Sequence, residues 1–239
     1  MIDDEYRNPD GSLTKTHFSL NRREFIKLLG GGIIIFFSVE DFASLEQERE
    51  RRGVRPGYPA DFNAYLRIGE DGRVTCFSGK IEMGQGVIIA LAQMLAEELS
   101  LPAESVDMIM GDTDVCPWDM GTFGSLSVRS FGPALRAAGA EARAVLLELA
   151  AEHLQTQIER LEAKGGLIFD KADPNKKVTY AELAKGMKIE RHMEKKPALK
   201  NYQEFSVIGK SIPRPDALEK VTGKAKYAGD IHLPEMLYA

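Results

Sequence analysis

The chain has 239 residues, of which 44% are hydrophobic and 28% are charged, and its formal net charge is -5. This is the composition of a globular protein with a core, and it disfavours a nucleic-acid partner because no surplus of basic residues remains to neutralise phosphates. The two cysteines cannot hold an iron–sulfur cluster, which needs about four thiolates, and the four histidines lack metal-ligand spacing. Any redox metal must therefore come with a cofactor or lie in a partner chain.

Residues 1–45 are expected to be a leader. Arg22 and Arg23 precede an apolar run at 28–39, which is the order of the charged and hydrophobic regions of an export signal. The run is about a dozen residues long, whereas a membrane-spanning helix needs about 20. The arginine pair resembles a twin-arginine signal, which predicts export to the periplasm.

Two features leave the fate of this leader open. Asn21 stands where Ser or Thr is usual, and residues 38–45 offer no clean small-x-small cleavage site. The segment 28–39 is therefore either removed or kept as a membrane anchor that faces the periplasm. The alternative is an amphipathic or buried helix of a cytosolic protein, starting at Arg22. Residues 46–60 are charged and then rich in Pro and Gly, which predicts a linker.

The sequence after this linker predicts alternating strands and helices. Strands follow from apolar-rich runs, helices from apolar residues at helical spacing, and a hairpin turn from Asp71-Gly72. The expected elements are strands at 64–68, 74–78 and 106–110, helices at 87–99 and 132–161, strands at 167–170 and 177–179, and a short helix at 180–186. Glu97 and Glu98 are expected on the side of the first helix opposite its apolar residues. This order predicts an α+β fold with helices packed on a mostly antiparallel sheet.

Composition also divides the chain into domains. The predicted parts are the leader at 1–45, a linker at 46–60, a domain at 61–190, a second linker at 191–205, and the incomplete start of another domain at 206–239. The last part ends on a strand-like run that has no evident partner strand.

Two polar loops follow strand ends, at 82–87 and 111–129, and we expect them to meet at one rim of the sheet, where ligands are commonly held. In the first loop, Gly84 and Gly86 flank Gln85. Glycines admit positive φ angles and close approach, the Gln85 amide both donates and accepts hydrogen bonds, and the N–H groups of the next helix favour an anion. The alternative for this loop alone is a plain turn that caps a helix.

The second loop contains hydroxyl and glycine residues over seven positions, 121–127. They include Thr122, Gly124, Ser125 and Ser127. This set fits a flat, polar, hydrogen-bonding ligand, and it supplies no nucleophile because no histidine lies nearby to activate a serine. The alternative is a polar loop that caps the following helix.

The two cysteines carry no assigned chemistry. Cys116 is expected to be a packed thiol. A disulfide between Cys76 and Cys116 would suit an oxidising compartment, but the sequence does not give the distance that such a bond needs.

Several spaced motifs in one order strongly resemble the molybdenum-binding subunit of the xanthine oxidase family, in its isoquinoline 1-oxidoreductase and nicotinate or aldehyde dehydrogenase branch. The motifs lie at 79–86, 90–93, 96–99, 111–114, 119–125 and 132–136. Segments 207–210, 220–227 and 230–234 resemble the opening of that family's α/β hammerhead domain. The resemblance runs from about residue 21 to the end, and the ordered set is more specific than any single loop.

The resemblance implies a molybdopterin cytosine dinucleotide cofactor with molybdenum, shared with a region downstream of this chain. It also implies hydroxylation of an aldehyde or an aromatic N-heterocycle with water as the oxygen source. Electrons would leave through a 2Fe-2S small subunit, often towards a cytochrome c subunit. Gly84, Gln85 and Gly86 would contact the cofactor. The residues that would bond the pterin and its phosphates are Thr122, Gly124, Ser125 and Ser127.

The family's catalytic glutamate, its second glutamine loop and its glycine–phenylalanine–glycine loop lie downstream of the hammerhead domain and are not in this sequence. Glu82 precedes the Gly-Gln-Gly turn and does not correspond to that glutamate. The resemblance thus places no catalytic residue and no metal ligand in this chain, which is expected to be inactive alone, either as a truncated piece or as half of a split subunit. The alternative function is a non-catalytic exported cofactor-binding or assembly protein with the same fold.

Overall fold

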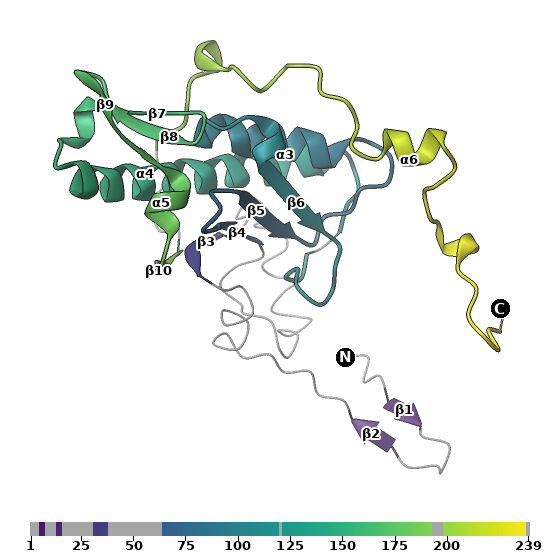
Figure 1. Cartoon of the computed structure of the whole chain (residues 1–239). Helices are drawn as coiled ribbons and strands as arrows, with labels where there is room; N and C mark the ends of the chain where they lie inside the picture. Colours follow the sequence, from purple (N-terminus) through teal and green to yellow (C-terminus); the bar gives the residue numbers. More distant parts are fainter. Residues whose placement is uncertain are drawn as a thin grey trace. The chain divides into compact units, whose positions relative to one another are not determined.

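The computed structural model describes residues 5–7, 13–15, 31–37, 64–119, 121–192 and 198–237. The chain divides into two compact units, Met1–Ile208 and Gly209–Ala239, and Figure 1 shows the elements of each. No helix within the described ranges is both long and apolar enough to cross a membrane.

The first unit is built on a five-stranded sheet with the strand order β10-β3-β4-β5-β6. Its strands are β3 (Gly32–Phe37), β4 (Ala64–Ile68), β5 (Val74–Ser78), β6 (Val106–Met110) and β10 (Lys188–His192). The pairs β3–β4 and β4–β5 are antiparallel, whereas β10–β3 and β5–β6 are parallel. The predicted α+β class is confirmed, with the difference that this sheet is mixed.

Helices α3 (Val87–Leu99) and α4 (Gly132–Leu154) pack on each other and cover one face of the sheet (Figure 1). Leu91, Leu95 and Leu99 of α3 follow the predicted helical spacing and are fully buried, and each contributes about 1.5–3 kcal/mol by leaving water. The helices approach closely at Gly139, where a Cβ atom would lie 2.9 Å from Cδ1 of Leu95. A larger residue at this position would push the two helices apart.

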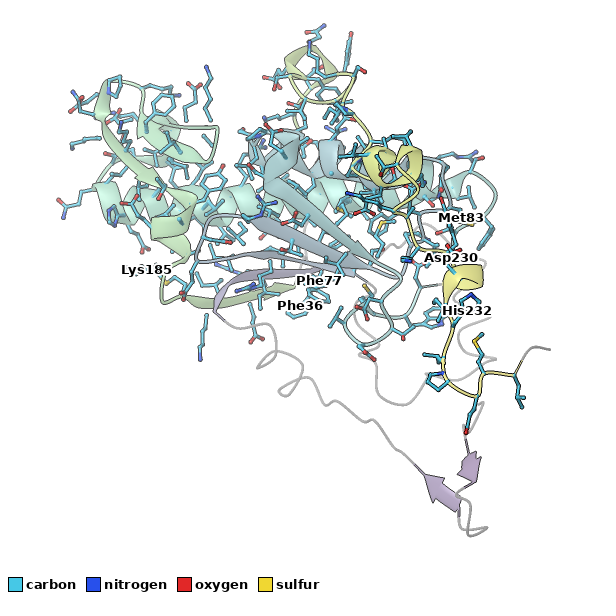
Figure 2. The ribbon with its side chains drawn as sticks, turned by 45° about the vertical axis from the view of Figure 1, so that its right-hand side comes forward. Phe36, Phe77, Met83, Lys185, Asp230 and His232 are labelled. Atoms are coloured by element: carbon cyan, nitrogen blue, oxygen red, sulfur yellow. The ribbon has the colours of Figure 1, made fainter. Side chains whose placement is uncertain are left out.

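The other face of the sheet has a row of aromatic residues across three strands. Phe36, Tyr65 and Phe77 are cross-strand neighbours, and Phe36 and Phe77 are labelled in Figure 2. The Tyr65 and Phe77 rings stack with their centroids 4.6 Å apart. The Tyr65 hydroxyl donates to the carbonyl oxygen of Val115 at 2.7 Å, and burial raises the Tyr65 pKa, which keeps the phenol a donor. Tyr65 therefore anchors the loop after β6 to the sheet.

The predicted helix at 132–161 is too long. Helix α4 ends at Leu154, and Gln155 adopts a left-handed conformation with φ of 50°. Leu161 begins strand β7 of a separate antiparallel sheet, ordered β7-β8-β9. Its strands are β7 (Leu161–Lys164), β8 (Leu167–Asp170) and β9 (Asp173–Thr179). The prediction failed because Leu154 and Leu161 are seven positions apart, which suits a continuous helix face as well as it suits a break followed by a strand.

Short elements complete this unit and include one confirmed prediction. Helix α5 (Tyr180–Ala184) starts where expected, because Thr179 and Glu182 form a reciprocal capping box. The remaining short elements are β1 (Glu5–Arg7) paired with β2 (Leu13–Lys15), and the single turns η1 (Ala103–Ser105), η3 (Ile158–Arg160) and η4 (Tyr202–Glu204). A π-helical turn, η2 (Ser127–Phe131), leads directly into α4.

Two strands of the large sheet were not predicted. Gly32–Phe37, in the apolar run at 28–39, forms β3, and its residues from Ile33 onwards are at most 3% exposed. The alternative of a helix is wrong for these residues, because an apolar run without periodicity fits a buried strand equally well. β10 covers 188–192, where the linker at 191–205 was expected to begin. The arginine pair, residues 38–45 and the linker 46–60 lie outside the described residues.

The second unit contains helix α6 (Ala217–Val221) and the turn η5 (Ala228–Asp230). Its described residues form no strand. They include residues 233–237, the described part of the run that was expected to be strand-like. A strand requires a partner for its backbone N–H and C=O groups. The expected hammerhead character of this unit stays a prediction.

Candidate functional site at the ends of β5 and β6

Two loops begin at the same edge of the large sheet. β5 and β6 are parallel, and Ser78 at the end of β5 lies opposite Met110 at the end of β6. The first loop, residues 79–86, leads into α3, and the second loop, residues 111–126, leads into η2 and α4. The structure therefore brings together the two loops that the sequence singled out.

Lys80 joins the two loops. Its Nζ atom donates to Oδ1 of Asp119 at 2.7 Å and to the carbonyl oxygen of Gly121 at 2.8 Å. The same Asp119 oxygen accepts the backbone N–H of Gly121 at 2.7 Å. The two charged side chains are only 14% and 4% exposed, so little water screens their attraction, and loss of either partner would strand the other charge.

The loops also make close backbone contacts. The N–H of Ile81 donates to Oγ1 of Thr122 at 2.8 Å. A Cβ atom on Gly79 would lie 2.4 Å from Cβ of Asp119, and one on Gly111 would lie 2.4 Å from Cδ1 of Ile81. Glycine is required at 79 because Cβ and backbone atoms of the opposite loop already fill that space, whereas at 111 it is favoured by the φ of 71°, since the end of the Ile81 side chain can move aside.

Glu82 holds the turn of the first loop. Its Oε1 accepts the backbone N–H groups of Gly84 and Gly86, each at 2.8 Å, and its Oε2 accepts the N–H of Ile88 at 3.1 Å. Gly86 is the N-cap residue of α3, with φ of 79°, and it has no side chain with which to cap the helix. Glu82 supplies the cap from four residues upstream.

Gln85 is exposed, but its amide is engaged within its own loop. Nε2 donates to the carbonyl oxygen of Ile81 at 2.9 Å, and Oε1 accepts the N–H of Met83 at 2.5 Å. Gly84 has φ of 99°, and a Cβ atom there would meet nothing within 4 Å. Met83, labelled in Figure 2, is 67% exposed on the same turn. This turn is open to solvent, and the Gln85 amide has a second N–H and a second lone pair with which to contact a ligand while it keeps its two loop bonds.

The predicted residues of the second loop divide into two groups. Gly124 and Ser125 are exposed and have φ of 61° and 56°, and Thr122 bonds the first loop. Ser127 is 8% exposed and begins η2, so the structure does not place it on the exposed rim. Phe123 is 51% exposed and offers an apolar surface beside these polar groups. The described residues contain no cluster of three or more potential metal-ligating side chains.

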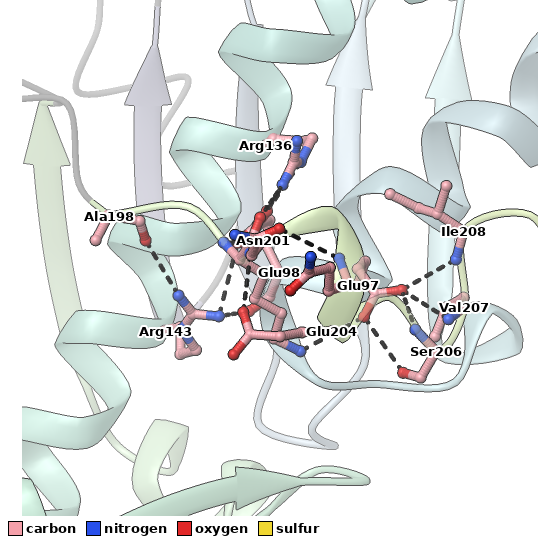
Figure 3. A network of polar contacts seen from close by, with 12 residues as sticks. Glu97, Glu98, Arg136, Arg143, Ala198, Asn201, Glu204, Ser206, Val207 and Ile208 are labelled. Atoms are coloured by element: carbon pink, nitrogen blue, oxygen red, sulfur yellow. Dashed lines mark hydrogen bonds and ion pairs between the residues drawn. The ribbon is translucent and has the colours of Figure 1, made fainter.

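The far end of α3 carries a buried carboxylate pair that the sequence analysis misplaced (Figure 3). Glu97 and Glu98 are fully buried, although the spacing placed them opposite the apolar face. Glu97 accepts the backbone N–H groups of Ser206, Val207 and Ile208 at 2.8, 2.6 and 3.0 Å. Burial alone would raise the Glu97 pKa, but these donors and nearby Lys200 together lower it below its ordinary value.

Glu98 binds both α4 and the segment that crosses it, which we call the strap (residues 198–208). Its Oε1 accepts Nε and Nη2 of Arg136 at 2.8 and 2.5 Å, and its Oε2 accepts the backbone N–H of Lys200 at 3.1 Å. Arg143 lies 3.6 Å from the same carboxylate, and the Arg136 guanidinium also stacks over the Phe205 ring. Part of the predicted linker at 191–205 is therefore fastened to the helices.

Cys76 and Cys116 are both buried and free, without a disulfide between them. Burial raises the pKa of each thiol, so both remain protonated and unreactive at neutral pH. Sγ of Cys116 lies 3.4 Å from the carbonyl oxygen of Ile109. The expectation that Cys116 is a packed thiol is confirmed.

Comparison with known proteins identifies the family to which this chain belongs. Residues 13–227 match the family model described as the molybdopterin cofactor-binding domain. Because this match covers most of the chain, the protein belongs to that family.

Individual proteins that resemble this chain show which enzymes of this family it is similar to. The chain is 34% identical over 174 residues to one subunit of the nicotinate dehydrogenase of Pseudomonas putida, covering 73% of this chain and 14% of that subunit. It is 29% identical over 220 residues to the beta subunit of isoquinoline 1-oxidoreductase from Brevundimonas diminuta, covering 74% and 28%. It is 32% identical over 119 residues to the carbon monoxide dehydrogenase large chain of Hydrogenophaga pseudoflava, covering 50% and 15%.

The chain thus corresponds to part of a molybdenum-binding subunit of the xanthine oxidase family, as its motifs predicted. It spans 14% and 28% of the length of the first two relatives. The roles of individual residues in the two loops stay predictions.

Sequence reasoning missed the residues that hold the loops and strap in place. No role was predicted for Lys80, Glu82 or Asp119, although all three lie within the motifs given above. The prediction for Glu97 and Glu98 was wrong, because it placed them opposite the apolar side of the helix and they are buried. The sequence did offer one indication of the Lys80–Asp119 contact, because it places a lysine in one loop and an aspartate in the other. No sequence signal marks Glu82 as a cap, because its acceptor oxygens reach residues two, four and six positions ahead.

Proposed function

We propose that this chain supplies a cofactor-binding part of a molybdenum hydroxylase that oxidises an aldehyde or an aromatic N-heterocycle with oxygen from water. The observation that carries the proposal is the joining of the two loops by Lys80 at one sheet edge. Fold alone would not assign chemistry, but family membership and this arrangement agree on a site for a polar organic cofactor.

The residues on this edge fit a pterin dinucleotide. Gly84 leaves its outer side open for close approach, and Gln85, Gly124 and Ser125 offer uncharged hydrogen-bonding groups on exposed backbone. Phe123 adds an apolar surface against which a flat ring could pack. These donors and acceptors suit a ligand with many hydrogen-bonding edges better than a simple ion.

The proposed division of labour follows from this inventory. A bound molybdopterin cofactor, in its cytosine dinucleotide form, would supply the redox chemistry. Gly84, Gln85 and Gly86 would contact the cofactor, while Thr122, Gly124 and Ser125 would bond the pterin and its phosphates. Ser127, which is 8% exposed at the start of η2, is included in the same proposed role.

Partners are part of the same proposal. We propose that the remaining region of a molybdenum-binding subunit completes the site, that a 2Fe-2S subunit accepts the electrons, and that a cytochrome c subunit receives them next. The relatives named above are subunits or chains of larger enzymes, which supports multi-chain assembly.

The test is metal and nucleotide analysis of the chain from its native host, alone and with co-purifying proteins. We expect molybdenum and released cytosine nucleotide in fractions that contain a second polypeptide together with this chain. Absence of both from every fraction would overturn the assignment. The Gln85→Ala variant is then expected to retain less cofactor than a Gln155→Ala control, whose substitution lies at the far end of α4.

The alternative is a non-catalytic exported protein that holds a pterin or another subunit. It predicts stable export of the chain with bound pterin but without any partner that carries the missing catalytic glutamate. Assay of the same fractions for oxidation of aldehydes and aromatic N-heterocycles separates the two functions, because only the enzyme shows this activity in the fraction that contains both polypeptides.

We also propose export to the periplasm through residues 21–39, supported by the arginine pair and the apolar run. In the folded chain residues 32–37 are buried in β3, so a receptor cannot bind them in that state. Residues 1–45 fused to a reporter are expected to reach the periplasm, and replacement of Arg22 and Arg23 by Lys should stop them. Retention of the wild-type fusion in the cytosol would contradict this proposal.

A further inference from the structure

The amino end of α3 already contains an anion. A helix amino terminus presents unpaired N–H groups and a partial positive charge, which together favour a phosphate or carboxylate. Here the Glu82 carboxylate accepts two donors of this helix end, from Gly86 and Ile88, at 2.8 and 3.1 Å, and a third from Gly84 in the preceding turn at 2.8 Å. Two of the donors that a phosphate would use are therefore bonded to a group of the chain itself.

We propose that Glu82 is a positioning residue that excludes phosphate from the amino end of α3 and holds the Gly84-Gln85-Gly86 turn in one conformation. This role of Glu82 rests on the proposed function and extends it, because it assigns the first loop to an uncharged part of the cofactor. The dinucleotide phosphates then bind away from α3.

The geometry explains why a carboxylate is needed. Gly84 and Gly86 have φ of 99° and 79°, conformations that leave both N–H groups pointing to one side of the turn, where Oε1 of Glu82 accepts both. An amide in place of the carboxylate would present one donor and one acceptor. Only a carboxylate accepts on both oxygens, so Gly84, Gly86 and Ile88 are all satisfied together.

The same turn determines how Gln85 is held. Its amide bonds Ile81 and Met83, the residues on either side of Glu82. With Glu82 fixed by α3, these two backbone groups are fixed as well, and the Gln85 side chain has one arrangement on an exposed turn. Glu82 thus acts through the backbone on the residue that the proposed function places against the cofactor.

The test uses the 239-residue chain, labelled with ¹⁵N-glycine, and inorganic phosphate as the probe. Phosphate is added at constant ionic strength against chloride, because salts also act non-specifically on stability and charge. We expect the Gly84 and Gly86 amide resonances of the wild type to be insensitive to phosphate. In Glu82→Ala they should shift saturably, with phosphate affinity about two- to fivefold above that of the wild type.

A pH titration keeps the proposal falsifiable if Glu82→Ala does not fold. In the wild type the two glycine amides should follow the titration of one carboxyl group, and Glu82→Gln should abolish that response. Glu159→Ala, at an exposed glutamate of η3, is the matched control and should leave both responses unchanged. Saturable phosphate shifts in the wild type, or a pH response that persists in Glu82→Gln, would overturn the proposal.

These readouts need no cofactor, so they separate two failures. If the metal and nucleotide analysis finds no cofactor, the proposed function fails while the amide titrations still decide the role of Glu82. If the cofactor is present and the wild-type amides respond to phosphate, the proposed function stands and the role of Glu82 fails.

Discussion

Helix α3 has a carboxylate near each end that accepts three backbone N–H groups, Glu82 before its amino end and Glu97 in its last turn. Glu82 is half-buried on an open turn, and its donors lie within its own loop and the first turn of the helix. Glu97 is fully buried, and its donors come from the strap, more than a hundred residues along the chain. The same bonding therefore serves different purposes at the two ends.

The difference is one of burial and of sequence distance. A buried carboxylate costs several kcal/mol to desolvate unless donors surround it, so Glu97 commits the strap to a single position. Glu82 remains accessible to water, so its bonds contribute less to the free energy of unfolding. The turn that it holds stays exposed, where a ligand can reach it. One end of α3 fixes the fold, and the other shapes the candidate site.

The largest effect is expected for Glu97→Ala. Removal of this buried carboxylate leaves three part-buried N–H groups of the strap without their acceptor, and the free energy of unfolding should fall by about 3–5 kcal/mol. Urea denaturation of the variant against the wild type measures the change. The exposed Glu159→Ala serves as control and should fall by less than about 0.5 kcal/mol. A similar loss in both variants would remove the distinction between buried and exposed carboxylates.

Acid should reproduce part of this loss. The folded-state pKa of Glu97 lies below its ordinary value of 4.5, so its ionised form contributes stability above that pH. The contribution is lost as pH falls from about the ordinary value through the folded pKa. Stability curves of the wild type and Glu97→Gln measured between neutral and acid pH should converge as the pH falls. Parallel curves would show that Glu97 does not titrate on unfolding.

A smaller effect is expected for Lys80→Met, which leaves Asp119 nearly buried without its cation. Unfolding should become easier by about 2–3 kcal/mol. The double variant Lys80→Met/Asp119→Asn should recover part of this loss, because no uncompensated charge then remains. The two side chains are not coupled if Asp119→Asn lowers the free energy of unfolding by the same amount in the Lys80→Met background as in the wild type. Urea denaturation of all four proteins completes the cycle.

The smallest stability effect is expected for Glu82→Ala, about 1 kcal/mol, as for loss of a helix cap. Its consequence should instead be local, in faster hydrogen exchange of the Gly84, Gly86 and Ile88 amides, while the Ser206 and Val207 amides stay protected. Mass spectrometry of exchanged peptides from the two regions measures this. A loss as large as that of Glu97→Ala would make the two carboxylates equivalent and end the comparison.

The sequence by itself determined the local elements of the central part. Asp71-Gly72 set the hairpin between β4 and β5, the apolar spacing over 87–99 set α3, and the Thr179–Glu182 capping box set the start of α5. These depend on residues close in the chain, where periodicity and turn chemistry act directly. The ordered motifs likewise identified the family, which the match over 13–227 confirmed.

Only the tertiary structure decided how distant segments share surfaces. The apolar run at 28–39 was interpreted as an export signal or a helix, and pairing with both β4 and β10 makes Gly32–Phe37 a strand. Glu97 and Glu98 matched a solvated helix face until the strap supplied donors to cover them. The physical reason is that burial of a charge depends on partners contributed from elsewhere in the chain, which local periodicity does not contain.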